Sequence, residues 1–95
     1  MLNQFSRTAL LVGTPAIAKL QASRVAIFGI GGVGGYVAEA LARSGVGYFD
    51  LIDNDMVALT NLNRQIIATH ATLGQPKVQV MAERIHAINP EAIVH

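Results

Sequence analysis

The chain of 95 residues contains no cysteine. Disulfide bonds, thiolate metal ligands and a cysteine nucleophile are therefore excluded within this sequence. No apolar run approaches the roughly 18 residues that indicate a membrane-spanning helix. The N-terminal stretch MLNQFSRTAL lacks the basic start and apolar core of a secretory signal. We therefore expect a cytoplasmic protein with no membrane partner.

Charge is also scarce, since charged residues make up 14% of the sequence and hydrophobic residues 52%. This composition excludes a disordered charged tail, and the net charge of +1 does not by itself indicate nucleic-acid binding. A small domain exposes a large fraction of its surface, and so few charged residues do not cover it well. We therefore expect part of a larger unit, or half of an obligate assembly, that associates through exposed apolar surface.

The residues that are present alternate between helix and strand patterns. Thr14 and Pro15 predict the start of a helix, with Thr14 as its N-cap and Pro15 at the first helical position. The apolar runs 24–28 and 48–52 predict buried strands, and a third strand is expected to begin near Ala92.

Helices are expected between these strands. Small and apolar residues recur at helical spacing from Val33 up to Gly45, a residue type that favours a helix end. Pro76 opens another helix, whose apolar stripe ends before Asn89. A short helical turn is expected over residues 61–68.

This order of elements predicts an α/β fold. It is typical of a Rossmann-like, three-layer architecture, here the first half of a doubly wound, mostly parallel sheet of about three strands, with an N-terminal helix. Within this piece, we expect Val25–Phe28 to form the central strand and to pair in parallel with its neighbours.

A glycine-rich loop follows the first predicted strand, where Gly29, Gly31 and Gly34 form the pattern G-x-G-x-x-G. Such glycines permit a tight turn and a close approach of the backbone to phosphate, and the following helix supplies N–H donors. Asp53 ends the second predicted strand, about twenty residues further on, where an acidic residue binds a ribose hydroxyl in this motif. The pattern favours nucleotide binding over a tight turn without a ligand, but it does not identify the nucleotide.

Polar and basic residues follow Asp53, beyond the carboxyl end of a strand, where ligands bind in open α/β sheets. Arg64 carries a planar guanidinium group, which can donate two parallel hydrogen bonds to a phosphate. Lys77 lies in the first turn of a predicted helix and opposes its dipole unless an anion is near. The alternatives are a surface loop whose side chains bond their own backbone and, for Lys77, an exposed lysine.

Four further residues have no local explanation. Arg7, taken alone, is a surface arginine. His70, His86 and His95 lack metal-ligand spacing, so we predict no metal ligand among them.

Taken together, the blocks GIGGVG, LIDND, TNLNRQ and GQPK resemble the adenylation domain of ubiquitin-activating, molybdopterin-synthase-activating and ThiF-like enzymes. The segments ALARSGVG and MAERIHAINP are most similar to the tRNA threonylcarbamoyladenosine dehydratase branch of that superfamily. The resemblance spans nearly the whole chain. It implies that residues 1–95 are the N-terminal part of one ATP-binding adenylation domain, whose remainder is absent from this chain.

The resemblance also implies site roles. Gly29, Gly31, Gly32 and Gly34 would line the phosphates and adenosine of ATP, and Asp53 would hold the ribose hydroxyls.

The remaining candidates would act on the phosphates. Asn61, Arg64 and Lys77 would bind the triphosphate and stabilise charge as pyrophosphate leaves, and Arg7 would reach into a partner subunit's site. Further members of the nucleotide-binding set would be Asp55, Thr60 and Asn63. The magnesium-binding aspartate of the family is expected beyond residue 95.

The function implied by the resemblance is ATP-dependent activation of a carboxylate by a homodimeric enzyme. The carboxylate would belong to a threonylcarbamoyl group on tRNA, which would then cyclise with loss of water, or to the C-terminus of a ubiquitin-like protein. The 95-residue piece alone is expected to be inactive. Two alternatives are a nicotinamide-dependent oxidoreductase, which shares the glycine loop and Asp53, and a non-catalytic nucleotide-sensing or dimerisation module.

Overall fold

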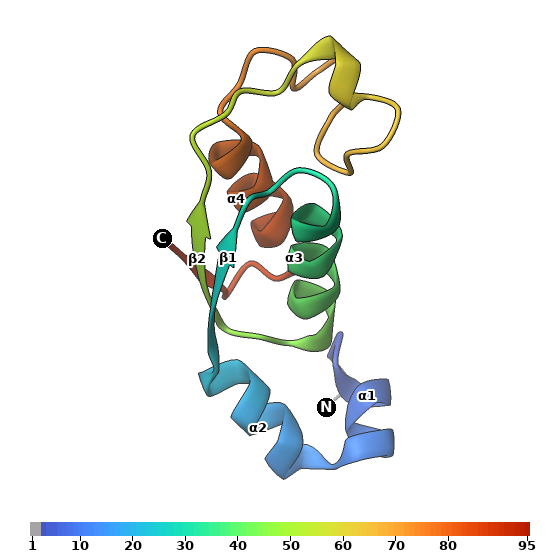
Figure 1. Ribbon diagram of the computed structural model, residues 1–95. Helices are drawn as coiled ribbons and strands as arrows, with labels where there is room; N and C mark the ends of the chain where they lie inside the picture. Colours follow the sequence, from blue (N-terminus) through green and yellow to red (C-terminus); the bar gives the residue numbers. More distant parts are fainter. Residues whose placement is uncertain (1–2) are drawn as a thin grey trace.

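The computed structural model describes residues 3–95. Its elements, in chain order, are α1 (Ser6–Val12), α2 (Thr14–Ala22), β1 (Arg24–Phe28), α3 (Val33–Ser44), β2 (Tyr48–Ile52), the 3₁₀ helix η1 (Leu59–Asn61), α4 (Lys77–Ile88) and β3 (Ile93–Val94). In Figure 1, α3 and α4 lie beside the strands, and α1 and α2 lie at one end of the sheet. Within residues 3–95, no helix is both long enough and apolar enough to cross a membrane.

The three strands form one parallel sheet in the order β1-β2-β3. The register pairs Arg24 with Tyr48 and runs to Phe28 with Ile52. The parallel pairing confirms the prediction, but the prediction that Val25–Phe28 is the central strand is wrong, because β2 is central. Each new strand adds to the same side of the strand before it, so β1 remains at an edge of this sheet.

Helices α3 and α4 pack against each other and against the strands. The largest fully buried side chains are Phe49, Ile30, Ile67, Met81, Ile85 and Val46. Successive strand residues point to opposite faces, so the other sheet face carries the Arg24–Asp50 ion pair (2.6 Å) and the exposed Phe28 and Ile52. Residues 3–95 thus supply one helical layer and the sheet.

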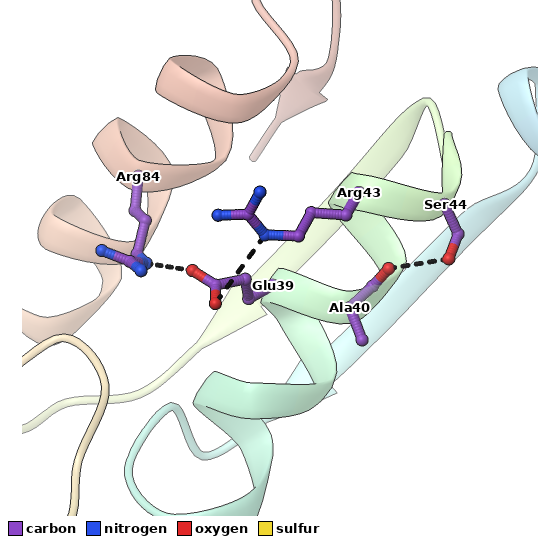
Figure 2. Close-up of polar contacts among 5 residues, drawn as sticks. All are labelled: Glu39, Ala40, Arg43, Ser44 and Arg84. Carbon is purple, nitrogen blue, oxygen red and sulfur yellow. Dashed lines mark hydrogen bonds and ion pairs between the residues drawn. The ribbon is translucent and has the colours of Figure 1, made fainter. Parts of the chain in front are cut away.

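A shared carboxylate joins the two helices of this layer. Glu39 of α3 accepts a hydrogen bond from Nε of Arg84 on α4, and its other oxygen lies 3.9 Å from Nε of Arg43 on α3 (Figure 2). The Glu39 side chain is 16% exposed, so water screens these contacts only in part. The packing of α3 on α4 therefore has an ionic contact beside its apolar core.

The N-terminal helices differ from the expectation. Helix α2 is present, but Gly13 (φ +87°) occupies its N-cap position, and Thr14 is already helical and makes no capping bond. A positive φ at a glycine gives the sharp bend by which the chain leaves α1. Helix α1 was not predicted, because its apolar residues Leu10 and Leu11 are adjacent and exposed rather than spaced along one buried face.

A long connection, residues 53–76, leads from β2 to α4. The expected helical turn begins earlier, as η1, and continues where the Gln65 N–H donates to the Asn61 carbonyl (2.9 Å). Val57 and Ile67 are buried and attach this polar segment to the core. The connection is thereby held against the carboxyl end of the sheet, where Figure 1 shows it.

Candidate functional site

Asp53 ties the glycine loop to the end of β2. One carboxylate oxygen, Oδ2, accepts the N–H of Ile30 within the glycine loop (2.8 Å), and Oδ1 accepts the N–H of Asp55 (2.8 Å). The Gly29 N–H also donates to the Ile52 carbonyl (2.8 Å). The structure thus brings the glycine loop and Asp53 together, as the motif predicts.

These contacts also set the ionisation of Asp53. Burial acts to raise the pKa of its carboxyl, but the N–H groups of Ile30 and Asp55 and the charge of Lys77 together outweigh burial and hold the pKa below its ordinary value. Asp53 is therefore a carboxylate at neutral pH. Each of its oxygens can accept a further hydrogen bond, so hydroxyl donors of a ligand can still be bound.

Two glycines of the loop are required for different physical reasons. A Cβ on Gly34 would lie 1.7 Å from the Gly29 carbonyl oxygen, so only glycine lets α3 start this close to β1. Gly32 is the N-cap residue of α3 and has φ +56°, a conformation that favours glycine. No protein atom lies within 4 Å of a Cβ built there. The first turn of α3 therefore presents its free N–H groups beside open space, which suits an anion.

Lys77 is buried rather than exposed, which is contrary to the alternative considered from the sequence. It is the first residue of α4, and its side chain is 8% exposed. Its Nζ lies 4.0 Å from Oδ2 of Asp55, the single carboxylate partner found within residues 3–95. Asp55 is 69% exposed, so this pair only weakly offsets the cost of burying an ammonium group. A second anion near Nζ would stabilise the charge.

Arg64 is held on the other side of the glycine loop. Its Nη1 donates to the carbonyl of Thr60 (2.9 Å) and to Oδ1 of Asn63 (3.0 Å), and the residue is exposed. No other hydrogen bond of this guanidinium is found within the described residues, so the rest of its planar fork is available to a ligand. Thr60 and Asn63 thus position Arg64.

Asn61 has a structural contact in the same segment. It is 8% exposed, and its Oδ1 accepts the N–H of Ala58 (2.8 Å) across η1. This side chain closes the turn that carries Arg64.

Two open hollows flank the glycine loop. One, of about 660 Å³, is lined by Phe28, Gly29, Leu51, Ile52, Asp53, Asn54, Asp55 and Val78. The other, of about 500 Å³, is almost wholly apolar and is lined by Gly32, Val33, Tyr36, Val37, Ala40 and Arg64. The glycine loop therefore separates a pocket that contains the Asp53 and Asp55 carboxylates from an apolar face of α3 beside Arg64.

Two sets of predicted residues lie elsewhere. Arg7 is exposed on α1, at the end of the sheet opposite the glycine loop, so it does not reach the site of its own chain (Figure 1). His86 places Nε2 2.9 Å from the Ala92 carbonyl, which is a structural contact. In residues 3–95, no three His, Cys, Asp or Glu side chains gather in a way that could hold a metal ion.

One residue at the site has no predicted role. Gln65 is 9% exposed and lies against Gly31, and its Oε1 is buried without a hydrogen-bond partner in the described part of the chain. Its position directly after Arg64 in the TNLNRQ block is the one signal in the sequence that draws attention to it.

Comparison with known proteins agrees with this geometry. The family model described as "ThiF family" matches residues 5–95. The chain is 54% identical over 94 residues to the tRNA threonylcarbamoyladenosine dehydratase of Bacillus subtilis (strain 168), which covers 99% of this chain and 37% of that protein. It is 44% identical over 75 residues to the molybdopterin-synthase adenylyltransferase of Escherichia coli (strain K12), covering 79% and 30%.

A solved structure also matches. The E. coli tRNA N6-threonylcarbamoyladenosine dehydratase TcdA in complex with ATP superposes with a TM-score of 0.93 at 49% identity, covering 96% of this chain and 37% of that one. The chain spans about a third of the length of the curated relatives it matches. Because the family model extends over nearly the whole sequence, the chain belongs to the ThiF family.

Proposed function

We propose that this chain is the nucleotide-binding part of an enzyme that activates a carboxylate with ATP. The observation that carries the proposal is Lys77, a buried ammonium group whose nearest carboxylate is 4.0 Å away and largely exposed. It lies at the same edge of the sheet as Asp53 and the glycine loop. A polyphosphate in this place would add negative charge beside Nζ, where Asp55 and Asp53 alone interact with it within the described residues.

Each group of the site has a role in binding ATP. The N–H groups at the start of α3 would donate to phosphate oxygens, and the free part of the Arg64 fork would bind the same polyphosphate. Asp53 would accept the ribose hydroxyls on the lone pairs that Ile30 and Asp55 leave free. Asn61, Thr60 and Asn63 would act by holding the Arg64 segment in place.

In this reaction the protein forms no covalent bond with the substrates. A carboxylate oxygen attacks the α-phosphorus of ATP, the bond from that phosphorus to the bridging oxygen breaks, and pyrophosphate leaves with the electron pair. The products are an acyl-adenylate and pyrophosphate. Positive groups already in place around the phosphates, here Arg64 and Lys77, stabilise the charge that develops on the leaving group. Magnesium would accompany ATP, with its protein ligand beyond residue 95.

The relatives favour a tRNA substrate. We propose that the activated group is the carboxylate of a threonylcarbamoyl modification, whose cyclisation removes water, because the B. subtilis and E. coli relatives carry that dehydratase name. This substrate would also place the protein in the cytoplasm, where tRNA is found. A second candidate is the C-terminus of a ubiquitin-like protein, because the chain also resembles molybdopterin-synthase and ThiS adenylyltransferases.

We also propose that the enzyme is a homodimer. Val33, Tyr36 and Val37 of α3 are 79%, 54% and 41% exposed and form an apolar stripe beside Arg64. A second subunit packed there would cover the stripe and complete the surroundings of the site. Arg7, which does not reach its own site, would then be free to reach the partner's.

The test uses the full-length protein that carries this segment. We expect calorimetry to give saturable binding of ATP with magnesium and negligible binding of NAD, together with ATP–pyrophosphate exchange in the presence of the acceptor. Tight binding of NAD without ATP would favour an oxidoreductase instead. Nucleotide binding with no exchange for any acceptor would favour a sensing module.

The acceptor is identified separately. We expect the nucleosides of tRNA from cells without the gene to keep open-chain threonylcarbamoyladenosine in place of its cyclic form by mass spectrometry. Unchanged nucleosides would direct the search to ubiquitin-like proteins.

A further inference from the structure

Gln65 has a buried amide without hydrogen bonds. The residue is 9% exposed, and its Oε1 is fully enclosed with no partner within residues 3–95. Buried polar atoms in folded proteins nearly always have a partner, so an orphan needs an explanation.

The backbone of Gln65, in contrast, is fully used. Its N–H donates to the Asn61 carbonyl (2.9 Å), and its own carbonyl accepts the Ala68 N–H (3.0 Å). The side chain is thus held in a fixed direction from a well-bonded turn. An amide fixed in this way and left unpaired is arranged for a group that the protein does not itself provide.

The amide lies on the phosphate side of the fold. A Cβ built on Gly31 would come within 2.8 Å of Nε2, 2.9 Å of Cδ and 3.0 Å of Oε1, so the whole carboxamide rests on the Cα of Gly31. Gly31 is in the middle of the glycine loop, between the loop N–H that binds Asp53 and the start of α3. Gln65 also follows Arg64 directly. Its amide is therefore next to two of the groups proposed to bind polyphosphate.

We propose that Gln65 is a further nucleotide-binding residue, whose carboxamide positions the glycine loop and completes its hydrogen bonds with the bound triphosphate, directly or through one ordered water. The NH₂ group donates to a phosphate oxygen or to an ordered water bound to it. Glycine at position 31 leaves the room that the carboxamide occupies. This inference rests on the proposed function, since it takes the ligand to be ATP.

The competing explanation is simple packing. If Gln65 only fills space beneath the loop, an apolar residue of similar size should serve equally well and should remove an unpaired polar atom. Gln65→Leu and Gln65→Met therefore separate the two explanations. Gln79 is exposed on α4, so Gln79→Leu is the matched control for the same chemical change on the surface.

The experiment measures Tm and the Kd for ATP and for AMP, by calorimetry on the full-length protein. We expect Gln65→Leu and Gln65→Met to keep the Tm or raise it, and to raise the Kd for ATP about tenfold or more. We expect the Kd for AMP to change little, because AMP lacks the β- and γ-phosphates. Gln79→Leu should bind both nucleotides like the wild type.

A second arm tests the contact with Gly31. We expect Gly31→Ala to displace the carboxamide and to weaken ATP binding. Its effect should not add to that of Gln65→Leu, because both changes remove one contact. Gln65→Glu keeps the size but brings a negative charge, so it should weaken ATP binding more than AMP binding.

Several results would overturn the inference. They are wild-type ATP affinity in Gln65→Leu, equal losses for ATP and AMP, and unfolding of both the Leu and Met variants, which would make the amide a structural requirement. Each of these presumes that the wild type binds ATP. If the wild type binds NAD and not ATP, the proposed function itself is what fails.

Discussion

Asp53 and Lys77 share one electrostatic environment at the carboxyl edge of the sheet. The N–H groups of Ile30 and Asp55, and after them the Lys77 charge, lower the pKa of Asp53 against the effect of burial, and the Asp53 carboxylate orders the glycine loop through the Ile30 N–H. Removing Asp53 therefore does more than remove a partner for ribose. Asp53→Ala should disturb the loop as well, so we expect a higher KM for ATP and also a lower kcat.

The first prediction concerns pH. Because the folded pKa of Asp53 lies below its ordinary value of 3.8, its contribution to stability is present above that value and is lost as pH falls through the lower folded pKa. We expect Asp53→Asn to lower the free energy of unfolding at neutral pH by about 1.5 kcal/mol or more. The difference from the wild type should shrink at acid pH.

Urea unfolding at several pH values measures this difference. Asp50, whose pKa is lowered by its hydrogen bond from Arg24, contributes its own acid dependence to both proteins, so the comparison with Asp53→Asn isolates Asp53. A pH-independent difference between wild type and variant would show that the Asp53 charge has no role in stability.

The second prediction concerns the two cations. Lys77→Met keeps the buried volume and removes the charge, so we expect unchanged or higher Tm and an adenylation rate lower by about 10- to 100-fold, the worth of a charge-assisted hydrogen bond of about 1.5–3 kcal/mol. Arg64→Ala should give a similar loss. If the contacts tighten as pyrophosphate leaves, kcat falls as well as kcat/KM.

ATP–pyrophosphate exchange is the measurement for both variants. Lys19→Met, on exposed helix α2 and away from the site, is the control and should keep wild-type exchange. Wild-type exchange in Lys77→Met and Arg64→Ala would reject the adenylation site as drawn.

Much of this site is predictable from sequence at the residue scale, because the glycines and Asp53 act through local motif geometry. The two site features that were not predicted depend on contacts between segments that are distant in the sequence. The burial of Lys77 follows from the packing of residues 53–76, and the orphan amide of Gln65 follows from its contact with Gly31. Neither contact has a periodic signal in the sequence.

At the scale of elements, the close contact of α3 with β1 sets the position of the helix that we propose binds phosphate. A Cβ on Gly34 would lie 1.7 Å from the Gly29 carbonyl oxygen, and Gly29 is itself tied to β2 because its N–H donates to the Ile52 carbonyl. The helix start cannot move away without disturbing the core residues beneath it, such as Ile30.

The third prediction follows from this contact. Gly34→Ala should destabilise the fold by about 3 kcal/mol, the upper part of the usual range for overpacking, because a backbone atom and not a flexible side chain is displaced. Urea unfolding measures the loss. Glu83→Ala, at an exposed position of α4, should be nearly neutral. A stable Gly34→Ala variant with normal ATP affinity would mean that α3 can start further from β1.

The fourth prediction concerns the ionic contact between α3 and α4. Glu39→Gln should lower the free energy of unfolding by about 1 kcal/mol, between the values for exposed and buried pairs, because Arg84 is 39% exposed. ATP affinity should be unchanged, since Glu39 contacts Arg84 and Arg43 and lines neither hollow beside the glycine loop. A double-mutant cycle with Arg84→Met measures the coupling, and zero coupling would contradict a stabilising role.

Element prediction succeeded where one face of an element is buried. Strands β1 and β2 and helices α3 and α4 show that pattern and lie where the sequence places them. Helices α1 and α2 both bury no residue, and α2 was predicted because Pro15 marks its start, a signal that α1 lacks. The order of strands was mistaken because burial alone does not determine which strand has neighbours on both sides.

Over the whole molecule, apolar surface is open to solvent in several places. It includes the sheet face with Phe28 (79% exposed), Ile52 and Ile93, the stripe on α3, and Leu10 and Leu11 on α1. Contiguous exposed apolar surface marks association sites in soluble proteins. The composition anticipated such surface.

The fifth prediction tests the stripe on α3. We expect Val33→Lys and Val37→Lys in the full-length protein to shift the homodimer toward monomer at equal concentration, as measured by light scattering. Gln79→Lys, on the exposed side of α4, should leave the oligomeric state unchanged. A wild-type protein that remains monomeric at high concentration would contradict the proposed dimer.

The backbone hydrogen bonds around Asp55 have a consequence for selectivity. Asp55 donates its N–H to the Asp53 carboxylate and accepts the N–H of Lys77 on its carbonyl. In the proposed site, the ribose-binding Asp53 and the phosphate-binding Lys77 are thus joined through the backbone of Asp55, which fixes the distance between them. Under this proposal, a nucleotide gains both interactions only when its ribose and its distal phosphates are separated by that distance.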